Sequence, residues 1–254
     1  MAGPLGSAAL SFGPAFLHVL FPSSCASCGA PRRGLGGGGL CRACWRALPR
    51  LDARDACASC ALPGAAPLCR SCLASPPPIG RAAAVAPYEG VARRLVHALK
   101  FRGHDILAAP AAALMADAAR PLSSGERTDA VVPVPSTPRR NRERGYDPAA
   151  LLALETARRL RRPFRPLLAR TREGVPQSSV PAAERRRNVR GAFFAAPRAR
   201  ALRLLLVDDV LTTGATAFEA ALALRAAGAA EVDLLLFART PEIRPARDTA
   251  PEAT

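Results

Sequence analysis

The chain has 254 residues and 49% of them are hydrophobic, so it can build one ordinary domain plus a smaller one, and a largely disordered chain is excluded. Its formal net charge is +16, although Lys100 is its only lysine. Because the positive charge comes almost wholly from arginine in an alanine-rich chain, a compositional bias can produce it. The charge therefore permits nucleic-acid binding without establishing it.

The N-terminal segment is apolar but does not look like a targeting signal. Its first twenty residues carry no lysine or arginine, whereas a signal peptide begins with a positively charged region. We interpret it as a short helix near Ala15–Leu20 that packs on the residues after it. No stretch elsewhere is long enough to span a bilayer, so we expect a cytoplasmic protein without a membrane span.

Cysteine is confined to one segment of the chain. All eight cysteines lie between residues 25 and 72 and form four CxxC pairs. Two pairs supply the four thiolates of a tetrahedral zinc site, and the glycine- and proline-rich sequence around them has too little apolar material to fold without metal. We predict a double zinc ribbon over residues 21–75. Grouped in chain order, the ligands are Cys25, Cys28, Cys41 and Cys44 in one site and Cys57, Cys60, Cys69 and Cys72 in the other.

Three alternatives to this reading stay open. The CxxC pairs can be grouped in a crossed order instead of chain order. Disulfides are disfavoured, because the segment lacks a signal peptide and the rest of the chain contains no cysteine. Four-cysteine sites also hold iron–sulfur clusters, which spacing alone does not exclude. Zinc is the favoured metal.

A proline-rich linker, LASPPPIGR, leads to a second domain that we place at residues 81–240. Its hydrophobic pattern predicts helices over residues 90–101, 105–120, 148–160 and 215–226, the last ending at Gly228. Strands are predicted near residues 82–87, within DAVVPVP, FRPLLAR and RGAFFAA, at 202–208 and within EVDLLLFAR. Strand, helix and strand in so few residues imply a parallel crossover, so we expect a doubly wound, mostly parallel α/β fold. Residues 241–254 are expected to form a disordered tail.

The stretch LLLVDDVLTTGAT is the clearest candidate site. Asp208 and Asp209 end an apolar run that is typical of a buried strand, and ligands of open α/β sheets bind at the carboxyl ends of strands. The start of the next helix offers backbone N–H groups, the helix dipole and hydroxyls that suit a phosphate monoester. The carboxylates suit sugar hydroxyls or water-bound Mg²⁺. A phosphorylated sugar satisfies both halves; the loop residues are Thr212, Thr213, Gly214, Ala215 and Thr216.

This stretch resembles the motif with which type I phosphoribosyltransferases bind 5-phosphoribosyl 1-diphosphate (PRPP). More widely, the CxxC-rich segment, YEGVARRLVHALKFRG, VVPVPSTPRRNRERGYDPAALLA, RRRNVRGAFFA and the PRPP motif occur in the order seen in ComF-type competence proteins. The resemblance implies a phosphoribosyltransferase-like domain and a role in natural transformation and the handling of incoming single-stranded DNA, with competence or recombination proteins as partners. One departure is Asp147-Pro148, where the family often shows Asn-Gln.

The resemblance also implies roles for individual residues. Asp208 and Asp209 would contact the ribose of PRPP, and the loop from Thr212 to Thr216 would hold its 5-phosphate. The turn around residues 135–137 would bind diphosphate. In an active enzyme a nitrogen nucleophile would displace diphosphate from C1 of the ribose, while a binding module would use the pocket without chemistry. The arginines placed to pair with diphosphate oxygens are Arg139, Arg140 and Arg144.

Two further features concern charge. Lys100, in HALKFRG, is a candidate cofactor-binding residue because every other basic residue of the chain except histidine is arginine; survival of one lysine by chance weighs about equally. Residues 136–203 hold many more arginines than acids, with interleaved aromatics that are candidates for a single-stranded DNA track. The alternative is that the aromatics are core and the arginines a solvated face. These aromatics are Tyr146, Phe164, Phe193 and Phe194.

Overall fold

The computed structural model of the chain describes residues 24–32, 39–101, 104–122, 128–170 and 191–241. The helix expected near Ala15, the tail from residue 242 onward and residues 171–190 of the arginine-rich stretch lie outside this part. The elements in chain order are α2 (Arg42–Arg46), α3 (Arg70–Ala74), β1 (Ala82–Pro87), α4 (Gly90–Phe101), η1 (Asp105–Leu107), α5 (Ala108–Ala118), β2 (Ala130–Pro133), α6 (Pro138–Arg144), α7 (Pro148–Leu160), β3 (Leu168–Arg170), β4 (Phe193–Ala195), η3 (Pro197–Ala199), β5 (Arg203–Leu211), α9 (Ala215–Ala226) and β6 (Glu231–Arg239).

The centre of the fold is a parallel sheet of four strands in the order β1-β6-β5-β2. Strand β5 pairs with β6 along its whole length but with β2 only as far as Val207, which lies opposite Pro133. Beyond this point β5 continues without a β2 neighbour. A small antiparallel pair, β3 and β4, lies outside the main sheet.

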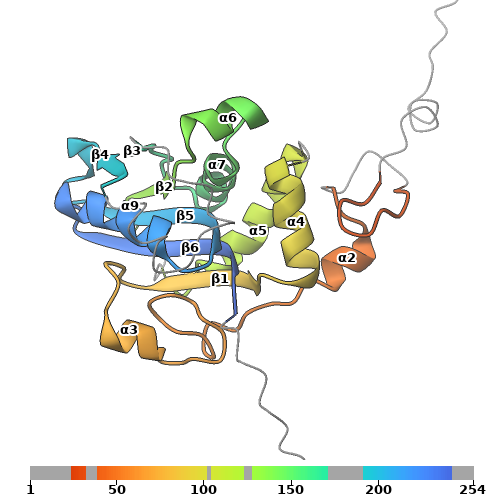
Figure 1. Ribbon diagram of the computed structural model, residues 1–254, viewed down its shortest axis with the longest axis horizontal. Helices are drawn as coiled ribbons and strands as arrows, with labels where there is room; N and C mark the ends of the chain where they lie inside the picture. Colours follow the sequence, from red (N-terminus) through yellow and green to blue (C-terminus); the bar gives the residue numbers. More distant parts are fainter. Residues whose placement is uncertain (1–23, 33–38, 102–103, 123–127, 171–190, 242–254) are drawn as a thin grey trace, which may run out of the picture.

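Both faces of the main sheet are covered, as Figure 1 shows. Successive side chains of a strand point to opposite faces, so the apolar strands supply two cores. Leu206 and Leu234 belong to the cluster that includes α9, β3 and β4. Leu205 and Leu235 belong to the cluster that includes α4, α5 and α7. The expected doubly wound, mostly parallel α/β fold is confirmed.

Several predicted elements have the bounds that the sequence indicated. Helices α4, α7 and α9 and strands β1 and β6 span the predicted residues. Helix α7 begins at Pro148, after Asp147 caps it by accepting from two backbone N–H groups. Helix α9 is followed by Gly228 with φ of +89°, a left-handed conformation that glycine adopts without strain.

Three elements differ from the prediction. The helix expected over residues 105–120 begins as a single 3-10 turn and ends at Ala118. Strand β5 continues to Leu211 instead of ending at residue 208, because β6 extends beside it and supplies hydrogen-bond partners. Helix α6 was not predicted. Thr137 caps it by accepting from the backbone of Arg140, with Pro138 in its first turn.

The cysteine-rich segment packs on the sheet domain in two places. Cys25 and Cys44 share a cluster with α4 and α5, whereas Cys57 and Cys72 share a cluster with the α9 side of the sheet. In Figure 1, α2 lies beside α4 and α3 lies on the other side of β1. The two halves of the segment therefore contact opposite faces of the sheet near its β1 edge.

Candidate functional site

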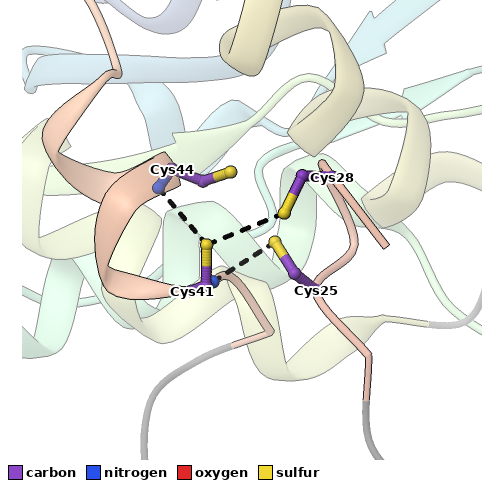
Figure 2. A group of neighbouring side chains, drawn as sticks. All are labelled: Cys25, Cys28, Cys41 and Cys44. Carbon is purple, nitrogen blue, oxygen red and sulfur yellow. Dashed lines mark hydrogen bonds between the residues drawn. The ribbon is translucent and has the colours of Figure 1, made fainter. Parts of the chain in front are cut away.

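The first group of four cysteines is built from a turn and a helix start. Cys25 and Cys28 lie in a turn closed by an isolated antiparallel bridge between Ser24 and Pro31. Cys41 is the N-cap of α2, and its backbone N–H donates to the sulfur of Cys25 at 3.2 Å. Figure 2 shows the four side chains gathered around one centre.

The second group repeats this arrangement. Its first two cysteines lie in a turn bridged between Ala56 and Pro63, and Cys69 is the N-cap of α3. The backbone N–H of Cys69 donates to the sulfur of Cys57 at 3.4 Å. All four of its cysteines are buried, whereas Cys28 in the first group is exposed.

Both groups fit zinc. The sulfurs within each group lie within 4.8 Å of one another, and the Sγ atoms of Cys28 and Cys41 are 3.8 Å apart. A tetrahedron with Zn–S bonds of about 2.3 Å places its sulfurs about 3.8 Å apart. The groups follow chain order, as preferred, and all eight cysteines are free thiols, so the disulfide alternative is wrong.

The other candidate site is a pocket at the carboxyl ends of β5 and β2. It opens where β5 runs past the end of β2 and the chain turns away at Val134–Ser136. All the predicted site residues of the sheet domain line it except Arg139. Those lining residues are Lys100, Arg140, Arg144, Asp208, Asp209, Thr212, Thr213, Gly214, Ala215 and Thr216.

One wall of the pocket is the loop between β5 and α9. Gly214 is the N-cap of α9 with φ of +83°, and no side chain caps the helix from this position. A Cβ at Gly214 would also meet the ring of Phe218 at 2.3 Å, so the position requires glycine. Backbone N–H groups at this helix start face the pocket together with threonine side chains, an arrangement that suits an anion.

The two aspartates occupy different environments. Asp209 is 6% exposed, and its Oδ1 lies 2.8 Å from Nζ of Lys100, so it is buried under α4. Asp208 keeps part of its surface exposed in the pocket and accepts from the backbone N–H of Asp209 at 2.8 Å. The sequence predicts both acids at the end of the strand, but the structure buries Asp209 within it. Because β5 is longer than expected, side-chain alternation turns this residue under the neighbouring helix.

Charge in this part of the pocket is strongly coupled. Burial raises the pKa of Asp208 to about 8, the Asp209 carboxylate adds to this, and the Lys100 ammonium opposes it. Burial alone would lower the pKa of Lys100, but the charges of the two aspartates outweigh it and raise the pKa. Lys100 therefore stays a cation and neutralises one carboxylate of the pair.

Helix α6 decides which arginines face the pocket. Arg140 and Arg144 are four residues apart and thus on one face of the helix, and both line the pocket. Arg139 is turned by about 100° from Arg140 and donates to Glu143 at 2.8 Å on the exposed side. The structure therefore does not bring Arg139 to the pocket, and this division follows only once the residues are known to form a helix.

Arg170 is a pocket residue that the sequence did not single out. It ends β3 and lines the pocket, with its guanidinium 5.4 Å from the ring centroid of Phe193. Its buried Nε finds no hydrogen-bond acceptor among the described residues. Burial lowers the pKa of Arg170, and the nearby positive charge of Arg140 acts in the same direction. An anion in the pocket would accept a hydrogen bond from Arg170 and favour its charged form.

Comparison with known proteins identifies the family. The double zinc ribbon domain family matches residues 16–73. The DNA utilization protein YhgH of Salmonella typhimurium is 35% identical over 208 residues, which cover 80% of this chain and 91% of that protein. The chain belongs to the ComF-type family. The competence protein F of Haemophilus influenzae is a further relative, 29% identical over 79% of this chain and 90% of that protein.

Among solved structures, a glutamine PRPP amidotransferase from B. subtilis in complex with ADP and GMP overlaps 50% of this ComF-type chain, with a TM-score of 0.35 and 23% identity. The overlap covers 26% of that enzyme's chain, so this chain spans about a quarter of its length. The overlap is partial. The strand order β1-β6-β5-β2 is a property of the ComF-type chain itself and defines its fold without this comparison.

The departure at Asp147-Pro148 has a structural role in this ComF-type chain. The carboxylate of Asp147 accepts from the backbone N–H of Ala149 at 3.0 Å and thereby caps α7. Its second oxygen accepts from the backbone N–H of Ser136 at 2.8 Å and from the side chain of Asn141 at 3.5 Å. One carboxylate therefore ties α6 and α7 to the turn that lines the pocket.

The aromatic residues divide between core and surface. Phe193 is buried at 8% exposure, while its neighbour Phe194 is 61% exposed on the opposite side of β4. Phe101, which was not singled out, is also 61% exposed and lies 5.0 Å from the guanidinium of Arg144.

Within the part of the chain that the structure describes, no helix is long and apolar enough to cross a membrane.

Proposed function

We propose that the pocket between β5, α6 and α9 binds PRPP together with Mg²⁺. The observation that carries this proposal is the convergence of two sets of anion-binding groups and an acidic pair in one pocket. The N-terminus of α9 with its threonines, Asp208 and the arginines of α6 and β3 all line it. A ligand with two separate phosphate groups joined by a sugar fits this charge pattern.

Each part of PRPP has its set of residues under this proposal. The loop Thr212–Thr216 holds the 5-phosphate through backbone N–H groups and hydroxyls. Asp208 accepts hydrogen bonds from ribose hydroxyls. The planar guanidinium groups of Arg140, Arg144 and Arg170 pair with diphosphate oxygens.

Magnesium fits the oxygen donors of this pocket. Mg²⁺ binds in proteins through one or two carboxylates, waters and substrate phosphates, and Asp208 is the more exposed of the two carboxylates that line the pocket. The ion would neutralise charge on the diphosphate. Lys100 holds Asp209 in place through the 2.8 Å contact between Nζ and Oδ1, so its role is to position the acidic pair.

Calorimetry tests the assignment. Purified zinc-loaded protein is titrated with PRPP in the presence of Mg²⁺, alongside Asp208→Asn and a control, Asp233→Asn, which changes the same chemical group near the amino end of β6. Above about pH 8, where the carboxyl of Asp208 is ionised, we expect binding by the wild type and the control, and a loss of at least about tenfold in Asp208→Asn, since hydrogen bonds to charged groups contribute about 1.5–3 kcal/mol. Absence of PRPP binding by the wild type contradicts the proposal.

Catalysis is a separate arm of the same proposal. A phosphoribosyltransferase would join a nitrogen nucleophile to C1 of the ribose and release diphosphate to the arginine side of the pocket. Incubation of PRPP and Mg²⁺ with nucleobases and simple amines, with diphosphate measured, distinguishes an enzyme from a binding module. Release that depends on one acceptor and is lost in Asp208→Asn supports the enzyme.

The relatives' names add a second candidate function, in the use of DNA. One relative is called a DNA utilization protein and another a competence protein. Arg139 and Arg142 lie on the exposed side of α6, next to the pocket but not in it. We propose that they contribute to binding of single-stranded DNA through its phosphates, with little sequence preference.

Fluorescence anisotropy with a labelled single strand at two salt concentrations tests this function. Arg139→Glu with Arg142→Glu should weaken binding and reduce the log–log salt slope by roughly 1.4, or about 0.7 per phosphate contact. Arg198→Glu with Arg200→Glu is the matched control, because it makes the same charge change beside the start of β5, at the other end of the sheet. Equal loss in both pairs would indicate a nonspecific charge effect and contradict a DNA site on α6.

A further inference from the structure

The side chain of Arg239 joins two parts of the molecule that are distant in sequence. It stands near the end of β6, opposite Leu211 of β5 and Pro87 of β1. Its Nε donates to the backbone carbonyl of Cys60 at 3.0 Å. Its Nη1 donates to the carbonyls of Leu211 and Thr212 at 3.0 and 2.7 Å.

The partners of Arg239 lie at the two candidate sites. Cys60 belongs to the second tetracysteine group. Leu211 ends β5 and Thr212 begins the loop between β5 and α9, and both line the pocket. A third carbonyl, that of Thr240, also accepts from Nη1 at 2.7 Å, and the N–H of Thr240 donates to Leu211. The guanidinium thus fixes the backbone at the start of the loop Thr212–Thr216, which we call the phosphate loop.

A guanidinium suits this position because its donors point in fixed, diverging directions from one plane. Nε and Nη1 can therefore serve acceptors on two different segments at once, whereas a lysine ammonium places its donors on one atom. The second tetracysteine group can hold Cys60 in place only while its own ligands are held together, which is what a structural metal does. The side chain of Arg239 is therefore a direct hydrogen-bonded link between the metal group and the loop.

We propose that Arg239 is a positioning residue that couples the second tetracysteine group to the phosphate loop, so that metal at Cys57, Cys60, Cys69 and Cys72 controls the affinity of the pocket. The effect on PRPP rests on the function proposed above, but the mechanical link does not. The first tetracysteine group packs instead against α4 and α5. Loss of metal there leaves the bonds of Arg239 in place.

Variants of Arg239 test the link directly. Arg239→Met removes all the donors, and Arg239→Lys keeps the charge but not the diverging geometry. The control is Arg225→Met. Arg225 also donates to backbone carbonyls, those of Ala229 and Ala230, but these lie beyond the C-terminus of α9, away from the pocket. We expect amide hydrogen exchange over residues 211–215 and 57–62 to speed up in both Arg239 variants, and not in Arg225→Met.

Affinity for Mg²⁺ and PRPP is the second measurement. Loss of the hydrogen bonds that hold the loop should weaken PRPP binding by about tenfold or more in both Arg239 variants. Arg225→Met should bind like the wild type. If Arg239→Lys restores both exchange protection and affinity, the residue acts through charge alone and the coupling is wrong. If the wild type does not bind PRPP, the proposed function fails, while hydrogen exchange still decides the link.

A matched pair of cysteine variants tests the role of the metal. Cys41 and Cys69 are the equivalent third ligands of the two groups, each the N-cap of a short helix. Cys69→Ser should release one zinc, speed exchange over residues 211–215 and weaken PRPP binding. Cys41→Ser should release one zinc with neither further effect. Equal effects of the two variants on the loop, or no effect of Cys69→Ser, would overturn the proposal.

Discussion

Replacement of Lys100 by methionine should destabilise the protein more than an ordinary surface change. The ammonium lies 2.8 Å from Oδ1 of Asp209, whose side chain is 8% exposed, and the side chain of Lys100 is 27% exposed. With an effective dielectric constant of about 20, Coulomb attraction at this distance is roughly 6 kcal/mol before desolvation is subtracted. Methionine fills a similar volume, so the change removes mainly the charge.

The net cost follows from what is left behind. Breaking a buried ion pair by removing one partner typically costs about 3–5 kcal/mol, because the other charge stays buried and unpaired. Partial exposure of Lys100 places the expected loss of unfolding free energy at about 2–4 kcal/mol. For a domain of this size, each kcal/mol lowers the melting temperature by roughly 2–4 °C, so we expect a drop of about 4–16 °C.

Urea unfolding of zinc-loaded protein at pH 7 measures this cost. The double variant Lys100→Met with Asp209→Asn is the informative control, because it removes both charges. It should be more stable than Lys100→Met alone, with a coupling energy of at least about 1 kcal/mol. A loss of less than about 0.5 kcal/mol in Lys100→Met, or strict additivity in the double variant, would refute the reasoning.

Three further predictions concern pH and metal. The pKa of Asp208 is raised to about 8, so its carboxyl holds a proton below that pH. The affinity for PRPP in the presence of Mg²⁺ should therefore rise by up to about tenfold per pH unit from pH 6 to 8. An affinity that calorimetry finds unchanged over this range would exclude loss of this proton on binding. Burial raises the pKa of Asp233 to about 6, so the native state retains its proton while the unfolded state loses it near pH 4, and wild-type stability falls as pH rises from about 4 to 6. Asp233→Asn should therefore be about 1–2 kcal/mol more stable than wild type at pH 7 and equal to it below pH 4 in chemical unfolding, and a less stable variant at pH 7 would contradict this. Purified protein should contain about two zinc ions per chain by elemental analysis, and chelation should unfold residues 21–75; iron with sulfide would contradict the zinc assignment.

The sequence by itself determined the features that depend on neighbours along the chain. Hydrophobic periodicity and end signals such as Asp147-Pro148 and Gly228 set the bounds of α7 and α9, because capping acts within one helical turn. The CxxC spacing determined the four pairs of metal ligands, since each pair meets within a single turn, whereas the structure decided which pairs share a metal group. The run from Asp208 to Thr216 indicated a site for a phosphorylated sugar, because the strand end, the loop and the helix start follow one another directly in the sequence.

Only the tertiary structure decided which distant side chains meet. Lys100 reaches Asp209 because α4 covers the end of β5, and Arg170 enters the pocket from the separate β3–β4 sheet. The separation of Arg139 from Arg140 required knowing that the turn after β2 becomes a helix. The bonds of Arg239 depend on β6 lying between β1 and β5, beside the second tetracysteine group. Such contacts leave no periodic trace in the sequence, because they are set by how strands and helices stack and not by the residues adjacent to each one.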